Sequence, residues 1–186
     1  VPLEDGYLAP RPFSEERIEV RYRAMNPGSV GHPDLCAKPC LHAVAGRCMN
    51  TEGCRFCHFS HLGKPKQLDK RDREAMKEAP TSDVRRLMLK VVREKSLSLL
   101  DSAETASALD RLTVACDLGS SPASGDGKRW RRVECTLKGM SMRHLLAVFD
   151  GLAKSDGAGD LTAAINSLLE VLLRGASARG DEAAAP

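Results

Sequence analysis

The chain has 186 residues, of which 42% are hydrophobic, 28% are charged and 4% are aromatic. This composition excludes a wholly disordered chain, and the length allows one ordinary domain or a small module beside a second small core. No apolar run reaches the roughly 18 residues that a membrane-spanning helix needs, and a formal net charge of +3 is too small to indicate a nucleic-acid partner by itself.

Residues 1–35 are expected to form an irregular arm, because five prolines interrupt the stretch at spacings that helices avoid. Within the arm, Ile18, Val20 and Tyr22 alternate with polar residues and indicate a short strand or extended strip. The first ten residues lack the basic start and apolar centre of a secretory signal. Since the chain does not begin with Met, we expect a fragment or a processed product.

The seven cysteines are unevenly placed, since five of them fall between Cys36 and Cys57 with histidines among them. A secreted disulfide framework usually has an even number of cysteines spread over a small domain. The clustering instead favours a metal site in a reducing compartment. We therefore expect an intracellular protein, either nuclear or cytoplasmic.

The predicted metal site lies in residues 36–63 and has the spacing C-x7-C-x5-C-x3-H, formed by Cys40, Cys48, Cys54 and His58. Thiolates and imidazole are the ligands that zinc prefers, and four of them complete a tetrahedron. Cys54 and His58 are four residues apart, which places them on one face of a helical turn. Because the protein fills every position, we expect one structural Zn²⁺ ion with no place for water or substrate.

Several neighbouring residues leave other ligand sets open. One alternative combines Cys48, either Cys54 or Cys57, and His61; another uses four cysteines, Cys36, Cys40, Cys54 and Cys57. Outside such sets, Cys57 would be a packed thiol or a spare ligand. The remaining histidines are expected to be solvent-exposed, and this includes His32, His42, His61 and His144. A catalytic Cys–His pair is not expected among so many competing ligands.

The stretch CLHAVAGRCMNTEGCRFCH, residues 40–58, resembles a CCCH-type zinc finger. Its ligand gaps fall inside the windows of that family, and Gly46, Gly53 and the aromatic Phe56 also agree with it. The resemblance covers these residues and no others. It implies a finger with little regular structure that the metal organises, and it implies binding to RNA, often single-stranded.

The same stretch carries candidate RNA-binding residues. Phe56 could stack on an unpaired base, while Arg55, Arg47 and Lys38 could contact phosphates or stack as guanidinium planes. Only one such aromatic lies inside the tetrad, so one finger alone should bind weakly. A zinc-stabilised scaffold for protein–protein interaction, without direct RNA binding, is therefore the alternative function.

Residues 64–80 are polar and helix-favouring, and they predict a charged helical linker that ends at Pro80. Residues 81–175 show apolar stripes at helical spacing, interrupted by a Gly/Ser-rich loop at 117–128. The stripes predict the buried faces of a mainly α-helical region, or a surface for a partner helix. The tail, 176–186, is expected to be disordered.

Within the helical region, residues 130–137 place Val133, Cys135 and Leu137 at alternate positions, which favours a strand. Cys116 and Cys135 are expected to pack as small apolar side chains. Trp130 lies among arginines in a basic strip, 127–143, and two roles are equally open to it: a nucleic-acid contact or an anchor in the helical core.

Catalytic motifs are missing from the sequence, which contains no Gly-rich phosphate loop, no carboxylate pair and no nucleophile elbow. We therefore do not expect an enzyme. The expected partners are single-stranded RNA and a protein that binds the C-terminal helices, with no membrane partner.

Overall fold

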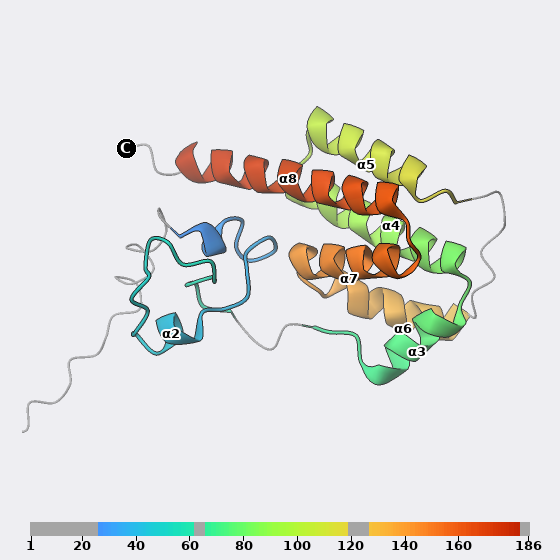
Figure 1. The fold of residues 1–186 in the computed structure, drawn as a ribbon, viewed down its shortest axis with the longest axis horizontal. Coiled ribbons are helices and arrows are strands. Elements are labelled where there is room, and N and C mark those ends of the chain that lie inside the picture. Colours follow the sequence, from blue (N-terminus) through green and yellow to red (C-terminus); the bar gives the residue numbers. More distant parts are fainter. Residues whose placement is uncertain (1–25, 62–65, 119–126, 183–186) are drawn as a thin grey trace, which may run out of the picture.

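The computed structural model describes residues 26–61, 66–118 and 127–182, in which all the regular elements are helical (Figure 1). The first part, residues 26–61, holds five of the seven cysteines and is called here the Cys/His module. It contains only a 3₁₀ helix, η1 (Pro27–Ser29), and one turn of helix, α2 (Leu41–Val44). The lack of long elements agrees with the expectation of a segment with little regular structure.

The second part, residues 66–118 and 127–182, is called here the helical bundle, and these described residues form six helices. They are α3 (Lys70–Glu78), α4 (Thr81–Leu99), α5 (Ala103–Ala115), α6 (Gly127–Lys138), α7 (Met142–Ser155) and α8 (Gly159–Glu182). Helix α8 packs along α5 and α7, and α4 lies against α5, α6 and α7. Helix α3 rests on α6 at one end of the bundle (Figure 1).

Local sequence explains where several of these helices begin. The side chains of Asp69, Ser102 and Ser141 each accept a hydrogen bond from the backbone N–H three residues later, at the starts of α3, α5 and α7. Such caps satisfy N–H groups that have no partner inside the helix. Pro80 immediately precedes α4, so the chain turns between α3 and α4 without a continuous helix.

The core of the bundle consists of the apolar stripes that the sequence indicates. Phe149 of α7, Leu109 of α5 and Met88 of α4 are almost completely buried, as are Leu168 and Leu172 of α8. Within each helix the buried apolar residues recur mostly three or four positions apart, so they share one face. These faces meet at the centre of the bundle. The prediction of a mainly helical region is confirmed.

The predicted strand at residues 130–137 is wrong, because this stretch lies within α6. Val133 and Leu137 are four residues apart and are both buried, which is the spacing of one helical face. Cys135 points away from that face and is exposed, so it does not pack as expected, whereas Cys116 is buried. Trp130 packs against the core, which favours its role as an anchor.

Several segment boundaries differ from the expected ones. Residues 26–35, assigned to the irregular arm, belong to the Cys/His module, and helix α8 continues through most of the expected tail to Glu182. The predicted strip at Ile18–Tyr22 lies outside the described residues, as does most of the loop at 117–128. Proline content alone did not reveal that residues 26–35 pack against neighbouring segments.

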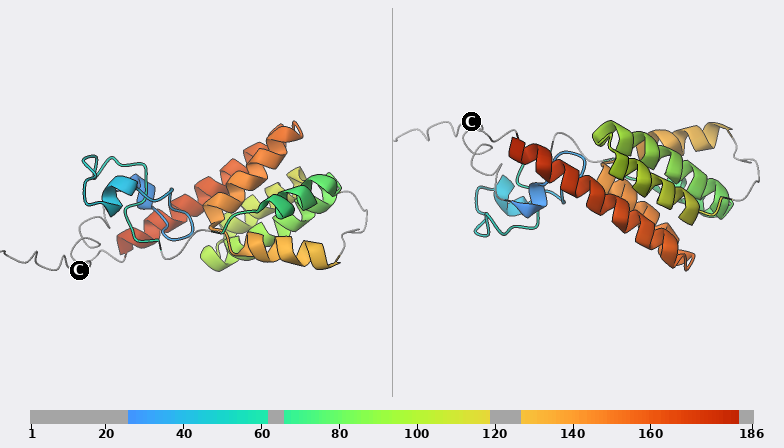
Figure 2. Two further views of the ribbon diagram at one scale, coloured as in Figure 1. Left: turned by 90° about the horizontal axis from the view of Figure 1, so that it is seen from below. Right: turned by 90° about the horizontal axis from the view of Figure 1, so that it is seen from above.

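The Cys/His module is attached to the bundle through Leu35, whose side chain is 2% exposed and belongs to the core of the bundle. Arg143 of α7 donates from its backbone N–H to the carbonyl of Asp34 (3.0 Å) and from its guanidinium to that of Leu35 (3.2 Å). Gly31 lies against Ala176 of α8. Figure 2 shows the module beside the C-terminal half of α8 in both views.

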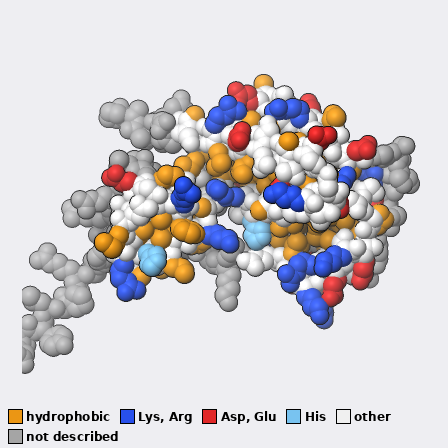
Figure 3. Space-filling view, viewed as in Figure 1, with side chains coloured by type: hydrophobic (Ala, Val, Ile, Leu, Met, Phe, Trp, Pro, Cys, Tyr) orange, Lys and Arg blue, Asp and Glu red, His pale blue; other side chains and the backbone are white. Residues whose placement is uncertain are grey.

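Basic residues of the bundle form ion pairs with acidic neighbours. Arg132 pairs with Asp69 and Asp72. Lys138 pairs with Glu94 and with Glu134, and both of these distances are 2.9 Å. Basic and acidic side chains are accordingly interspersed over this part of the surface (Figure 3). Among the described helices, none combines the length and apolar character that crossing a bilayer requires.

Candidate metal centre

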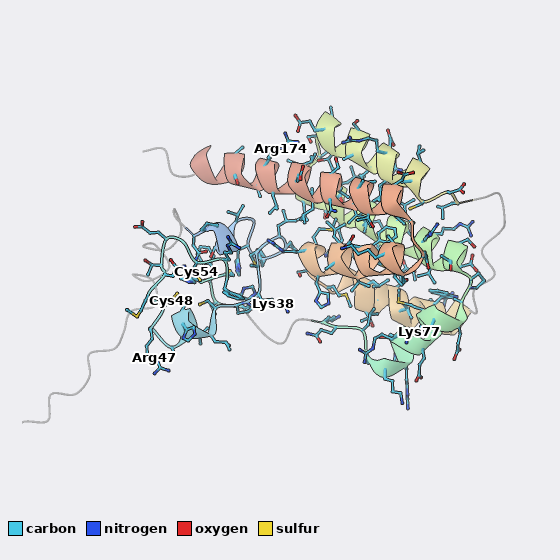
Figure 4. The ribbon with its side chains drawn as sticks, viewed as in Figure 1. Lys38, Arg47, Cys48, Cys54, Lys77 and Arg174 are labelled. Atoms are coloured by element: carbon cyan, nitrogen blue, oxygen red, sulfur yellow. The ribbon has the colours of Figure 1, made fainter. Side chains whose placement is uncertain are left out.

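The predicted tetrad is brought together in the Cys/His module. The ligand atoms of Cys40, Cys48, Cys54 and His58 all lie within 4.8 Å of one another. The Sγ atoms of Cys40 and Cys54 are 3.9 Å apart. Two sulfurs on a tetrahedral zinc, each about 2.3 Å from the metal, would be about 3.8 Å apart. Figure 4 shows Cys48 and Cys54 within the module. The four residues form a group that could hold a metal ion.

Backbone hydrogen bonds place these ligands. The chain around Pro39 pairs with Cys57, through bonds from Cys40 N–H to the Cys57 carbonyl (2.7 Å) and from Cys57 N–H to the Lys38 carbonyl (2.9 Å). This pairing sets Cys40 beside the segment that carries Cys54 and His58. The His58 backbone N–H also donates to the Ser29 hydroxyl at 2.9 Å, which ties the segment to η1.

The protonation of two ligands favours metal binding. Burial opposes ionisation of the Cys40 thiol, but hydrogen bonds outweigh it and lower its pKa, the Ala43 N–H first among them. Burial lowers the pKa of the His58 imidazole, which keeps it neutral. A metal binds thiolate and neutral imidazole, so both shifts favour the binding form.

A second group lies in the same module, and sequence analysis did not assign it. His32, Cys36, Cys57 and His61 also place their ligand atoms within 4.8 Å of one another. The expectation that His32 and His61 are solvent-exposed is therefore wrong, since both are partly buried. A hydrogen bond between the two thiols lowers the pKa of Cys57 to about 4 and raises that of Cys36. The spacing H-x3-C followed by C-x3-H could have indicated this group.

The two groups alternate along the chain and share no ligand. Cys54 and His58 belong to the first group, whereas Cys57 and His61 belong to the second. Neither of the alternative ligand sets drawn from the sequence is assembled, because Cys36 and Cys57 lie with the two histidines rather than with Cys40 and Cys54. The Cys/His module therefore offers two separate four-residue groups.

The candidate RNA-binding side chains all reach the surface of the module. Phe56 is 51% exposed, and Lys38, Arg47 and Arg55 are exposed as well. These three basic side chains form no ion pair with any residue that the structure describes. Arg47 extends away from the bundle in Figure 4.

The module also exposes apolar side chains that the sequence analysis did not single out. Met49 is 99% exposed, Leu41 is 81% exposed and Val44 is 76% exposed. Leu41 and Val44 lie on the single turn of α2, which is too short to bury one face. Figure 3 shows apolar side chains gathered over the module with basic ones at its edge.

Gly28 permits the close approach of η1 to the segment that carries the ligands. Its N–H donates to the Cys54 carbonyl at 3.2 Å, and a Cβ at this position would lie 2.4 Å from the backbone of Phe56. Backbone atoms cannot move aside as a flexible side chain can. Any larger residue must therefore push η1 away from Cys54 and Phe56.

We expect the Gly28→Ala variant to bind metal more weakly than the unchanged chain. Overpacking of this kind costs roughly 1–3 kcal/mol, which corresponds to roughly a fivefold to 150-fold loss of affinity. Competition against a chromophoric chelator measures the change. Gly159→Ala is the matched control, since a Cβ there meets nothing within 4 Å. Equal affinities for the two variants would contradict the expected role of Gly28.

Comparison with protein-family models, with curated proteins and with solved structures finds no match to this chain. The functional argument therefore rests on the residues and their geometry.

Proposed function

We propose that the chain is a zinc-binding protein in which Cys40, Cys48, Cys54 and His58 hold one structural Zn²⁺ ion in a CCCH-type finger that binds single-stranded RNA. The observation that carries the proposal is the closed four-ligand group beside an exposed aromatic ring and exposed basic side chains. Three thiolates and one imidazole suit zinc, and no ligand position remains for a substrate. The role is therefore binding rather than catalysis, in the nucleus or the cytoplasm.

The zinc ion has an organising role in this mechanism. It draws Cys40, Cys48, Cys54 and His58 to one point and so fixes the loops between them. The exposed ring of Phe56 then offers a flat face on which an unpaired base can stack. Lys38, Arg47 and Arg55 supply positive charge for the phosphates that flank this base.

Titration of the zinc-loaded chain with short single-stranded RNAs tests the proposal. We expect Phe56→Ala to weaken binding by about 1–3 kcal/mol, roughly fivefold to 150-fold, because one stacking contact is lost. We expect Arg55→Ala to weaken binding less and to reduce the slope of log affinity against log salt by about 0.7. Zinc content should stay unchanged in both variants.

Two matched controls come from the helical bundle. Val114→Ala removes an exposed apolar side chain from α5, and Lys77→Ala removes an exposed basic one from α3, away from the module in Figure 4. Both should bind RNA as the unchanged chain does. If the zinc-loaded chain is not retained by RNA at physiological salt, RNA binding is refuted and the zinc site is not.

A second candidate function is a zinc-stabilised scaffold for protein–protein interaction, and the exposed Leu41, Val44 and Met49 favour it. Aliphatic side chains stack poorly on bases but pack well against an apolar partner surface. Under this function, a Leu41→Ser/Val44→Ser double variant loses the protein partner. Neither the unchanged chain nor the Phe56→Ala variant is then retained by RNA at physiological salt. The helices of the bundle would offer such a partner a further contact surface.

A further inference from the structure

We propose that His32, Cys36, Cys57 and His61 bind a second zinc ion, so that the Cys/His module contains two metal sites. This goes beyond the proposed function, which requires only the ion held by Cys40, Cys48, Cys54 and His58. The argument rests on the distances between the ligand atoms, on the burial of the thiols and on the segments that hold them.

The distances match the edges of a zinc tetrahedron. With Zn–S bonds of about 2.3 Å and Zn–N bonds of about 2.0–2.1 Å, sulfur and nitrogen ligands should lie about 3.6 Å apart. Cys36 Sγ lies 3.5 Å from His32 Nδ1 and 3.7 Å from His61 Nε2. Cys57 Sγ lies 3.4 Å from His32 Nδ1. Three edges thus agree with one central ion.

The thiols of this cluster are buried and surrounded by polar atoms. The Cys36 sulfur lies within 3.7 Å of two imidazole nitrogens and 3.5 Å from the Pro33 carbonyl. Cys36 and Cys57 are only 6% and 1% exposed, so water has little access to them. Four groups that each bring a lone pair to one buried point are suited to a cation.

Contacts beyond the four ligand atoms hold these residues in place. The Leu35 N–H donates to the Gly31 carbonyl at 2.8 Å, forming one tight turn that sets His32 and Cys36 side by side. The Phe59 ring packs on His32 at 5.0 Å, and the rings of His32 and His61 meet edge-on at 4.8 Å. Such support from surrounding groups fixes the direction of each imidazole.

Charge also favours a divalent ion at this position. Two thiolates balance the charge of Zn²⁺, and two neutral imidazoles complete the Cys₂His₂ set that is typical of structural zinc sites. The mixed sulfur and nitrogen donors favour zinc over magnesium or calcium, which prefer oxygen.

The second ion would also strengthen the attachment of the module to the bundle. Two of its ligands, His32 and Cys36, flank Asp34 and Leu35, which contact the bundle through Arg143 and through burial in the core. The other two, Cys57 and His61, come from the segment that carries the first site. The second ion therefore links the docking segment to the proposed RNA-binding finger.

Native mass spectrometry of the zinc-reconstituted chain tests the proposal. We expect two zinc ions for the unchanged chain and one for the His32→Ala/His61→Ala double variant. The His42→Ala variant is the matched control, because this exposed histidine belongs to neither group, and it should retain two. Two ions in the double variant, or one in the unchanged chain at saturating zinc, would overturn the second site.

Cobalt substitution provides a second, spectroscopic measurement. Co²⁺ at both sites forms five bonds to cysteine sulfur, whereas the first site alone forms three. The near-ultraviolet charge-transfer absorption at saturation should therefore exceed that of the double variant by about two thirds, since each thiolate contributes. If the double variant fails to fold, the number of Co²⁺ equivalents that saturate the unchanged chain still decides: two support the site, and one overturns it.

These results separate the two proposals. A chain with one bound ion that also binds RNA refutes the second site and leaves the proposed function in place. A chain with two bound ions and no affinity for RNA supports the second site and refutes RNA binding.

Discussion

Removal of the metal is expected to unfold the Cys/His module and to leave the helical bundle folded. The module has only η1 and a single turn of helix. Leu35 is one of its buried apolar residues, but this side chain belongs to the core of the bundle. Its own interior consists mostly of cysteines that belong to the two Cys/His groups. Zinc binding supplies on the order of 10 kcal/mol to folding in modules of this size, and a chelator takes it away.

Hydrogen exchange read by mass spectrometry measures this result. After chelation, we expect the amides of residues 26–61 to exchange at the rate of an unfolded chain, while α4, α7 and α8 remain protected. Cys54→Ser should raise exchange in residues 40–58 without a chelator, since it removes a ligand of the first group only. Cys135→Ser is the matched control, because this exposed cysteine lies outside both groups. Protection of residues 26–61 that survives chelation would refute a metal-organised module.

The second large effect is expected in the bundle, where Phe149→Ala should lower the free energy of unfolding by about 3–5 kcal/mol. The Phe149 ring is fully buried on α7, which packs between α4 and α8. Its removal loses apolar contact and leaves a cavity that rigid neighbouring helices cannot fill. Because domains are stable by only about 5–15 kcal/mol, this is a large share of the total.

Urea denaturation followed by circular dichroism measures the change, since most of the described helix lies in the bundle. Val114→Ala is the control, because its side chain is 81% exposed on α5 and its loss should cost about 0.5 kcal/mol or less. A midpoint for Phe149→Ala that matches that of Val114→Ala would show that the ring is not a core residue.

The helical stripes were predictable because burial repeats with the period of a helix. Val84, Met88 and Val91 recur at helical spacing and are buried on one face of α4. Asp101 falls between α4 and α5. In α5 the helical spacing agrees less well with burial. Ala106 lies three residues before the buried Leu109 but is exposed, while the small polar Thr105 is buried in its place.

Short apolar runs were harder to assign. Val133, Cys135 and Leu137 fit an alternating pattern, but Val133 and Leu137 equally fit a helix at four-residue spacing. Only packing against α3 and α4 distinguishes a strand from a helix here, and a sequence of eight residues does not reveal such packing.

The two Cys/His groups differ in how much the sequence reveals. Cys40, Cys48, Cys54 and His58 lie in one short stretch, so their spacing alone predicts that they meet. The second group pairs His32 and Cys36 with Cys57 and His61, about 25 positions later, and His32 lies in the segment that prolines marked as irregular. Its assembly depends on the close contact of Gly28 with Phe56, which no local pattern predicts.

The burial of Leu35 means that the bundle and the module cannot turn independently while that side chain stays in place. A protein bound to the helices would therefore also fix the orientation of the Phe56 ring. An RNA strand bound to the module would then extend in a defined direction relative to that protein, which a flexible linker between the two parts would not achieve.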